Sequence, residues 1–100
     1  MIYFDAAATT PVRPEVLAAL APLYTGDFGN PSSTHSAGAT AGRALDYARR
    51  TAADVLGCRP GDVVFTSGGP EADNLAIKGL ALASPQGRHI VSSAVEHPAV

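Results

Sequence analysis

The sequence has little of what several classes of protein need. Its single cysteine, Cys58, excludes an internal disulfide and a cysteine-rich metal site, and it fits a reducing compartment. The net charge is −2 and the longest basic cluster is Arg49–Arg50, so nucleic acids and acidic membrane surfaces are poor candidate partners. No apolar run is long enough to cross a membrane, and residues 1–5 do not have the pattern of a signal peptide. These absences predict a cytoplasmic protein.

The length and the composition of the chain point to a fragment. Its 100 residues are close to the size of one small domain, which buries roughly 60% of its unfolded surface, so an independent core is not assured. The strands and helices that the pattern suggests are too few to cover both faces of a sheet. Residues 92–100 are mostly apolar and include no polar tail. We therefore expect these residues to be part of a longer chain.

The most informative stretch covers residues 63–78 and reads V-V-F-T-S-G-G-P-E-A-D-N-L-A-I-K. Its first three residues are β-branched or aromatic, which is typical of a short buried strand. Gly68 and Gly69 follow, and from Pro70 apolar residues recur at three- and four-residue steps, which predicts a helix with proline at its first position. A helix start after a glycine turn exposes unpaired N–H groups at the positive end of the helix dipole. Such a turn can hold an anion, usually a phosphate.

The same turn also has features that argue against an anion. Pro70 has no N–H to donate. Glu71 and Asp73 place negative charge in the first turn of the helix, where it stabilises the helix and repels a phosphate. Turns of this kind occur in many α/β proteins simply to reverse the chain. On this stretch alone, a phosphate-binding turn and a plain reversal both stay open.

A first helix is predicted upstream, from Pro14 onward. Pro22 lies late in it and should kink or end it. Residues 25–33 then read T-G-D-F-G-N-P-S-S, a sequence of turn-forming residues that predicts a loop. The apolar face of this helix consists of Val16, Leu17, Leu20, Leu23 and Tyr24.

The second helix has the clearest periodicity in the chain. Ser32 or Ser33 can cap its start, and Gly57 should end it as a left-handed C-cap. Gly38 and Gly42 each cost about 1 kcal/mol relative to alanine, so we expect loose first turns. Its apolar stripe consists of Ala41, Ala44, Leu45, Ala48, Ala52, Val55 and Leu56.

Short apolar runs predict strands at residues 2–4, 63–65 and 89–92. The last two flank the helix that starts at Pro70, which predicts a β-α-β unit with parallel strands and a right-handed crossover. Ligands in such sheets bind beyond the carboxyl ends of the strands. Residues 67–70 and 96–98 both leave strands at that edge, so we expect two candidate functional loops on one edge.

Four segments of the chain match the motifs of a known family. They read D-A-A-A-T-T-P at 5–11, F-G-N-P-S-S at 28–33, T-S-G-G and E-A-D-N-L-A-I-K-G at 66–69 and 71–79, and E-H-P-A-V at 96–100. In this order and spacing they resemble the N-terminal quarter of a cysteine desulfurase of the branch that serves general iron–sulfur assembly. The resemblance implies an α/β fold, that of the fold-type I, pyridoxal-phosphate-dependent transferases of aminotransferase class V. Residues 1–13 would be an N-terminal segment of the small domain, and residues 14–100 the incomplete first part of the large domain.

The resemblance implies roles for two places. Gly69 and Pro70 stand where the family binds the phosphate of pyridoxal 5'-phosphate. His97 stands where the family has a histidine that stacks on the pyridine ring, which makes it the candidate catalytic residue. A flat imidazole on one face would fix the plane of the ring and leave the other face open. Pro70 departs from the family, which has a threonine there, so the Gly69 N–H and Ser67 remain as donors.

The implied activity is the conversion of L-cysteine to L-alanine, with the sulfur left as an enzyme persulfide for iron–sulfur clusters or other sulfur transfer. The implied partners are L-cysteine, a second copy in a homodimer, and a sulfur-acceptor or iron–sulfur scaffold protein. The family's Schiff-base lysine, persulfide cysteine and substrate arginine lie beyond residue 100, so we expect these residues alone to be inactive. The alternatives are a related class V lyase or aminotransferase, and a non-catalytic remnant, which Pro70 favours and His97 disfavours.

The remaining reactive side chains have simpler interpretations. Lys78, the single lysine, shares a helix face with Glu71 and Asn74, which predicts a solvated or ion-paired side chain. Cys58 follows the second helix in a turn and is best explained as a structural cysteine. His35 stands at the head of that helix, where we expect a scaffold or interface role.

Overall fold

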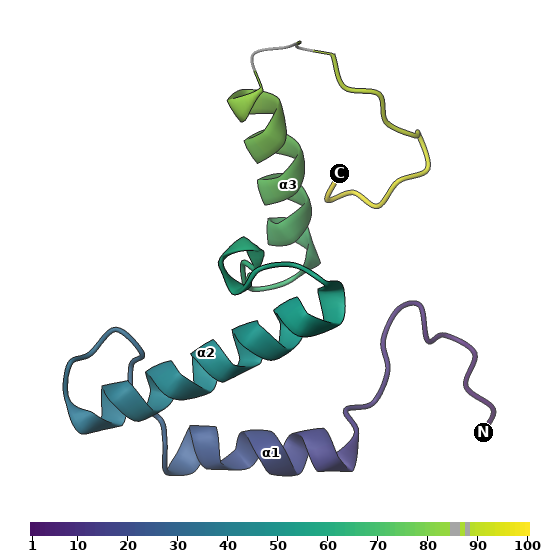
Figure 1. Cartoon of the computed structure of the whole chain (residues 1–100). Coiled ribbons are helices and arrows are strands. Elements are labelled where there is room, and N and C mark those ends of the chain that lie inside the picture. Colours follow the sequence, from purple (N-terminus) through teal and green to yellow (C-terminus); the bar gives the residue numbers. More distant parts are fainter. Residues whose placement is uncertain (85–86, 88) are drawn as a thin grey trace. The chain divides into compact units, whose positions relative to one another are not determined.

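The structure is a computed structural model that describes residues 1–84, 87 and 89–100. The described residues form the helices α1 (Pro14–Thr25), α2 (Ser36–Leu56) and α3 (Gly69–Ala83), and the 3-10 turn η1 (Pro60–Asp62) (Figure 1). The chain divides into two units, Met1–Val63 and Val64–Val100. The first unit contains α1, α2 and η1, and the second contains α3 and the segment that follows it.

Helix α1 begins where the sequence predicts and continues past Pro22, where a kink or an end was expected, to the start of the predicted loop. Pro14 occupies its first turn, as expected for a residue whose missing N–H costs nothing there. Pro22 does not end the helix, which continues to Thr25. A proline removes only its own N–H from the helix, and the Pro22 carbonyl still accepts the N–H groups of Gly26 and Asp27, each at 2.9 Å. The chain therefore leaves α1 at Gly26.

The cap of helix α2 is His35, and the prediction of Ser32 or Ser33 is wrong. His35 Nδ1 accepts the Gly38 N–H at 3.3 Å, which satisfies one of the unpaired donors at the helix start. The two serines lie in a turn before the helix. The Ser32 N–H donates to Asn30 Oδ1 and the Ser33 N–H to the Asn30 carbonyl, both at 2.9 Å. The two serines therefore belong to the turn, and His35 is the residue that directly precedes the first helical residue, Ser36.

Close backbone contact explains the glycines at the start of α2. A Cβ on Gly38 would lie 2.3 Å from the Ser33 carbonyl oxygen, and a Cβ on Gly29 would lie 2.3 Å from the Ala37 carbonyl oxygen. Gly38 is buried. The loop before α2 therefore lies directly against its first turns, and the prediction of looseness does not hold at Gly38. Gly42 is different, because a Cβ there would meet Pro31 at an ordinary 3.5 Å.

The end of α2 follows the prediction. Gly57 is left-handed, with φ 67° and ψ 34°, and Cys58 N–H donates to the Ala53 carbonyl at 3.0 Å. Ala53 is fully buried, and η1 packs against this helix. An ion pair of 2.8 Å joins Arg59 to Asp62 across η1.

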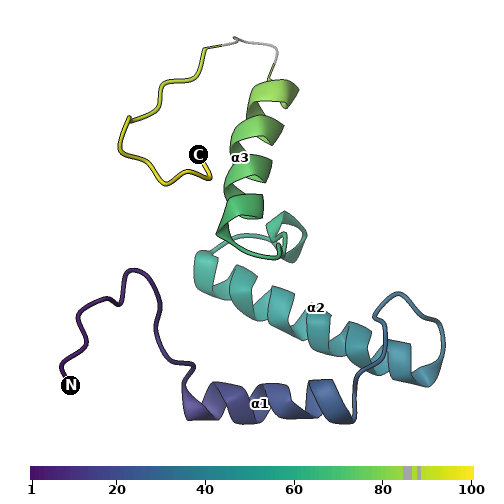
Figure 2. The ribbon, with the colours of Figure 1, turned by 180° about the vertical axis from the view of Figure 1, so that it is seen from behind.

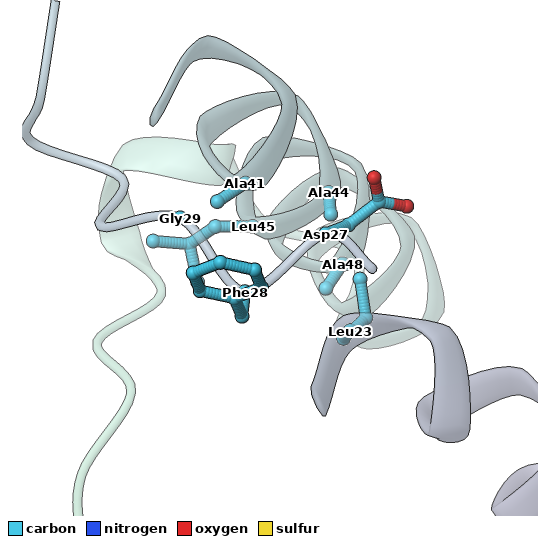
Figure 3. Close-up of a pocket in the computed structure, with 8 residues that line it drawn as sticks. All are labelled: Leu23, Asp27, Phe28, Gly29, Ala41, Ala44, Leu45 and Ala48. Atoms are coloured by element: carbon cyan, nitrogen blue, oxygen red, sulfur yellow. The ribbon is translucent and has the colours of Figure 1, made fainter. Parts of the chain in front are cut away.

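The apolar stripe of α2 is only partly covered. Its first half lines a hollow of about 270 Å³ together with Leu23 of α1 and Phe28 of the connecting loop, while the Asp27 carboxylate points away (Figure 3). At the other end, Val55 and Leu56 are 81% and 71% exposed. In the first half of the predicted stripe Ala41 is buried, whereas Leu45 and Ala48 are exposed although they line the hollow. The α2 residues that line the hollow are Ala41, Ala44, Leu45 and Ala48.

Helix α3 starts one residue earlier than predicted. Gly68 is the N-cap, Gly69 is the first helical residue, and Pro70 is the second, where an N–H is equally dispensable. No residue of α3 is buried. The segment that ends at Val100 returns alongside this helix (Figure 2).

The predicted strands at 2–4, 63–65 and 89–92 are not strands within the described part of the chain. A strand forms only when another strand pairs with its backbone, and the described residues form no such pair. Val63 keeps an extended conformation, with φ −92° and ψ 120°, as a strand residue would. The described residues therefore contain no β-α-β unit.

Candidate functional site

An acidic side chain closes the turn that leads into α3. The Glu71 carboxylate accepts two hydrogen bonds at Oε2, from the Ser67 hydroxyl at 2.6 Å and from the Ser67 N–H at 2.7 Å. The bond from the Ser67 hydroxyl, and to a smaller extent the bond from the Ser67 N–H, hold the pKa of the Glu71 carboxyl below its usual value. The turn thus carries an anion of its own. Sequence reasoning placed this charge in the first turn and missed its contact with Ser67.

The first turn of α3 has few backbone donors for an external ligand. Pro70 has none, and the Ala72 N–H already donates to the Gly68 carbonyl at 3.1 Å. The N–H groups of Gly69 and Glu71 lie at the helix start, where no intrahelical partner exists. The site therefore offers two backbone N–H groups, and the Ser67 donors only when Glu71 releases them.

His97 lies exposed in the last loop of the chain. Its Nδ1 accepts the Ala99 N–H at 3.1 Å, and its carbonyl accepts the Val100 N–H at 2.9 Å. Both bonds are local, so they fix the imidazole relative to its own loop. The ring faces are not packed into a core, and a flat ligand can reach them.

Asn74 joins the two predicted loops. Its Nδ2 amide donates to the Pro70 carbonyl at 2.8 Å and to the Ala99 carbonyl at 3.0 Å. The first bond lies within α3 and the second spans 25 residues. Asn74 therefore ties the first turns of α3 to the loop of His97, which runs beside this helix in Figure 1. Sequence reasoning placed Asn74 on the solvated face of α3. Its position four residues after Pro70 was the one signal that its amide could reach the Pro70 carbonyl.

The other reactive side chains remain outside this arrangement. Lys78 does not pair with Glu71, whose carboxylate bonds to Ser67. Cys58 is a free, exposed cysteine. His35 has the predicted scaffold role, since its ring caps α2.

The described residues contain neither a candidate metal site nor a helix that could span a membrane. No cluster of three or more His, Cys, Asp or Glu side chains there could hold a metal ion. Among the helices of the same residues, none has the length and apolar character to cross a membrane.

Comparison with known proteins defines the class. The family model "Aminotransferase class-V" matches residues 2–100, so the chain belongs to the class-V aminotransferase family, whose members have fold-type I. Among curated proteins, it is 51% identical over 100 residues to "Cysteine desulfurase IscS" of Methanosarcina thermophila, covering 99% of this chain and 25% of that protein. It is 52% identical over 101 residues to "Cysteine desulfurase" of Frankia sp. (strain EuIK1), covering 100% of this chain and 24% of the relative. The chain thus spans about a quarter of the length of the curated relatives it matches.

Proposed function

We propose that the full-length protein containing these residues is a pyridoxal-phosphate-dependent cysteine desulfurase. It would take sulfur from L-cysteine, release L-alanine, and hold the sulfur as a persulfide for iron–sulfur cluster assembly or another acceptor. One observation carries the proposal: proteins named cysteine desulfurase are about half identical to this chain from end to end. The matched range covers every segment that forms the candidate site.

The residues fit the cofactor in part. The N–H groups of Gly69 and Glu71 suit a phosphate at a helix N-terminus, whereas Pro70 adds no donor and Ser67 is bonded to a carboxylate. We assign the phosphate to the turn at Gly69 and Pro70, and one face of the ring to His97. When bound, the cofactor supplies an electron sink for the substrate carbon. The chain's own contribution is to hold the phosphate and to orient the ring.

The groups that react with substrate are assigned outside residues 1–100. Lys78 lies on the exposed surface of α3, so we do not give it the Schiff base. Cys58 follows the C-cap of α2, and we do not give it the sulfur. The proposal therefore requires a lysine and a mobile cysteine later in the full-length chain.

The same proposal covers architecture and partners. Residues 1–13 belong to the small domain and residues 14–100 to the large domain, whose α/β sheet is completed when 63–65 and 89–92 pair with strands from the rest of the protein. The protein acts in the cytoplasm as a homodimer and passes sulfur to an acceptor or scaffold protein. The exposed apolar residues of α2, such as Val55 and Leu56, support a larger fold that covers them.

The test is made on purified full-length protein. We expect it to bind pyridoxal phosphate, seen by absorbance, and to form L-alanine and sulfide in equal amounts from L-cysteine and a thiol reductant. A related lyase or aminotransferase would bind the cofactor and form other products. A non-catalytic remnant, which Pro70 and the bonded Ser67 favour, would form none. Either result would overturn the proposal.

A further inference from the structure

The Glu71 carboxylate occupies donors that a bound phosphate would use. Carboxylate and phosphate oxygens are both anionic acceptors, and both form short, charge-assisted hydrogen bonds. Glu71 Oε2 takes the hydroxyl and the N–H of Ser67 at 2.6 and 2.7 Å, which lie in that short range. Ser67 directly precedes the N-cap Gly68, at the positive end of α3. An internal anion therefore stands at the place where an external anion would bind.

The loss of a donor at Pro70 increases the importance of Ser67. With no N–H at Pro70, the turn keeps the Gly69 and Glu71 N–H groups and the two Ser67 donors. Half of this set is bonded to Glu71. A phosphate that gains the Ser67 donors must displace the carboxylate, because two anions cannot share them without strong repulsion.

Opening this contact requires no rearrangement of the fold. Glu71 and Ser67 are both exposed, and no residue of α3 is buried. The Glu71 side chain can turn into water by rotating about its own bonds, while the turn stays in place. Release therefore costs the two hydrogen bonds, which water replaces.

We propose that Glu71 is a built-in competitor of the cofactor phosphate, which holds Ser67 in the empty protein and must leave it when the cofactor binds. The inference rests on the proposed function, since it takes pyridoxal phosphate as the ligand of this turn. A competitor of this kind sets how tightly the phosphate is held. It also keeps the helix start formed while the site is empty, because a glutamate at this position satisfies backbone donors before the helix.

The experiment measures dissociation constants of cofactor-free, full-length protein by absorbance titration. Pyridoxal phosphate and pyridoxal, which has no phosphate, are compared on wild type, Glu71→Gln and Glu71→Ala. Asp73→Asn is the matched control, because it removes the same charge two residues away without breaking the Ser67 contact. Circular dichroism verifies that each variant is folded.

We expect both Glu71 variants to bind pyridoxal phosphate about threefold to tenfold more tightly than wild type, a change of roughly 1 kcal/mol. Pyridoxal affinity should not change, and Asp73→Asn should give the smaller gain. An equal or weaker affinity for pyridoxal phosphate in the Glu71 variants would show that Glu71 acts only as a helix cap. An equal gain in Asp73→Asn would show that the effect is general charge repulsion. Each of these results overturns the inference and leaves the proposed function standing. Failure of every protein to bind pyridoxal phosphate would overturn both.

Discussion

The two units of the chain obtain their order in different ways. Met1–Val63 contains all of the buried residues in the described part of the chain, Gly38, Ala41 and Ala53, and its loop lies in backbone contact with α2. Val64–Val100 has no buried residue among those described, and polar side chains connect its parts. The first unit is held by close packing of small residues, and the second by hydrogen bonds that are exposed, as at Ser67 and Glu71, or partly buried, as at Asn74 and Ala99. A ligand can replace hydrogen bonds that solvent reaches, such as those of Val64–Val100. This property suits the unit that carries the candidate site.

This difference separates the expected effects of mutation. Substitutions in the first unit should change the free energy of unfolding and leave cofactor affinity nearly unchanged. Substitutions in the second should change cofactor affinity and leave stability nearly unchanged. All measurements are made on the full-length protein.

The largest effect on stability is expected for Gly38→Ala. The added Cβ would lie 2.3 Å from the Ser33 carbonyl oxygen and 2.8 Å from that of Asn30, so the loop must move away from α2. Overpacking of this kind costs about 1–3 kcal/mol, which exceeds the gain of up to about 1 kcal/mol in helix propensity. Urea denaturation should show a net loss of stability. Gly42→Ala is the control and should be neutral or gain about 0.5–1 kcal/mol; equal behaviour of the two variants would contradict the close contact.

The largest effect on cofactor affinity is expected for Pro70→Thr, in the second unit. The change restores an N–H and adds a hydroxyl at the start of α3, and charge-assisted hydrogen bonds to an anion contribute about 1.5–3 kcal/mol each. Pyridoxal phosphate should bind at least about tenfold more tightly, since ~1.4 kcal/mol is tenfold. Stability should change little, because proline is well tolerated at this position. Equal dissociation constants for wild type and Pro70→Thr, measured at matched salt, would contradict the assignment of the phosphate to this turn.

A smaller effect is expected for His97→Ala. The side chain is exposed, so its loss leaves no cavity and the denaturation midpoint should not move. Stacking between flat rings contributes about 0.5–1.5 kcal/mol, so pyridoxal phosphate should bind about twofold to tenfold more weakly, with slower turnover. His89→Ala is the control at the other described histidine of this unit. Unchanged affinity, absorbance and rate in His97→Ala would remove the stacking role.

The smallest effect concerns acid and the exposed pair Arg59–Asp62. The guanidinium of Arg59 holds the pKa of Asp62 below its usual value of about 3.8. A lowered pKa means that the pair's contribution is complete above about pH 4 and is lost as the pH falls through the lowered value. Denaturation midpoints of wild type should therefore fall slightly more steeply than those of Asp62→Asn below about pH 4. Parallel curves would mean that the pair adds nothing to stability, as many surface pairs do not.

Local signals in the sequence predicted the helices well. Proline at Pro14, apolar periodicity along α2 and glycine at Gly57 each act within a few residues, and the structure confirms all three. The cap of α2 was missed because serine is the commoner cap, and nothing local shows that Asn30 has already bonded the Ser32 and Ser33 N–H groups.

Contacts between residues far apart in the chain could not be predicted from the sequence. Helix propensity alone predicts that Gly38 destabilises α2. The structure shows that a glycine is needed there because the backbone of Ser33 lies against it. The bond from Asn74 to Ala99 spans 25 residues and has no periodic signature. Strand patterns state a preference for extended backbone, but a strand also needs a partner to pair with.

The hydrogen bond within the last loop determines where the imidazole of His97 carries its hydrogen. Because Nδ1 accepts the Ala99 N–H, the neutral ring must be the Nε2–H tautomer. That outer nitrogen is then a donor, so a group that meets the ring at this edge has to be an acceptor. The same loop presents the Ala99 carbonyl to Asn74 of α3, so the bond that sets this tautomer and the bond that attaches the loop are both made by the backbone of Ala99.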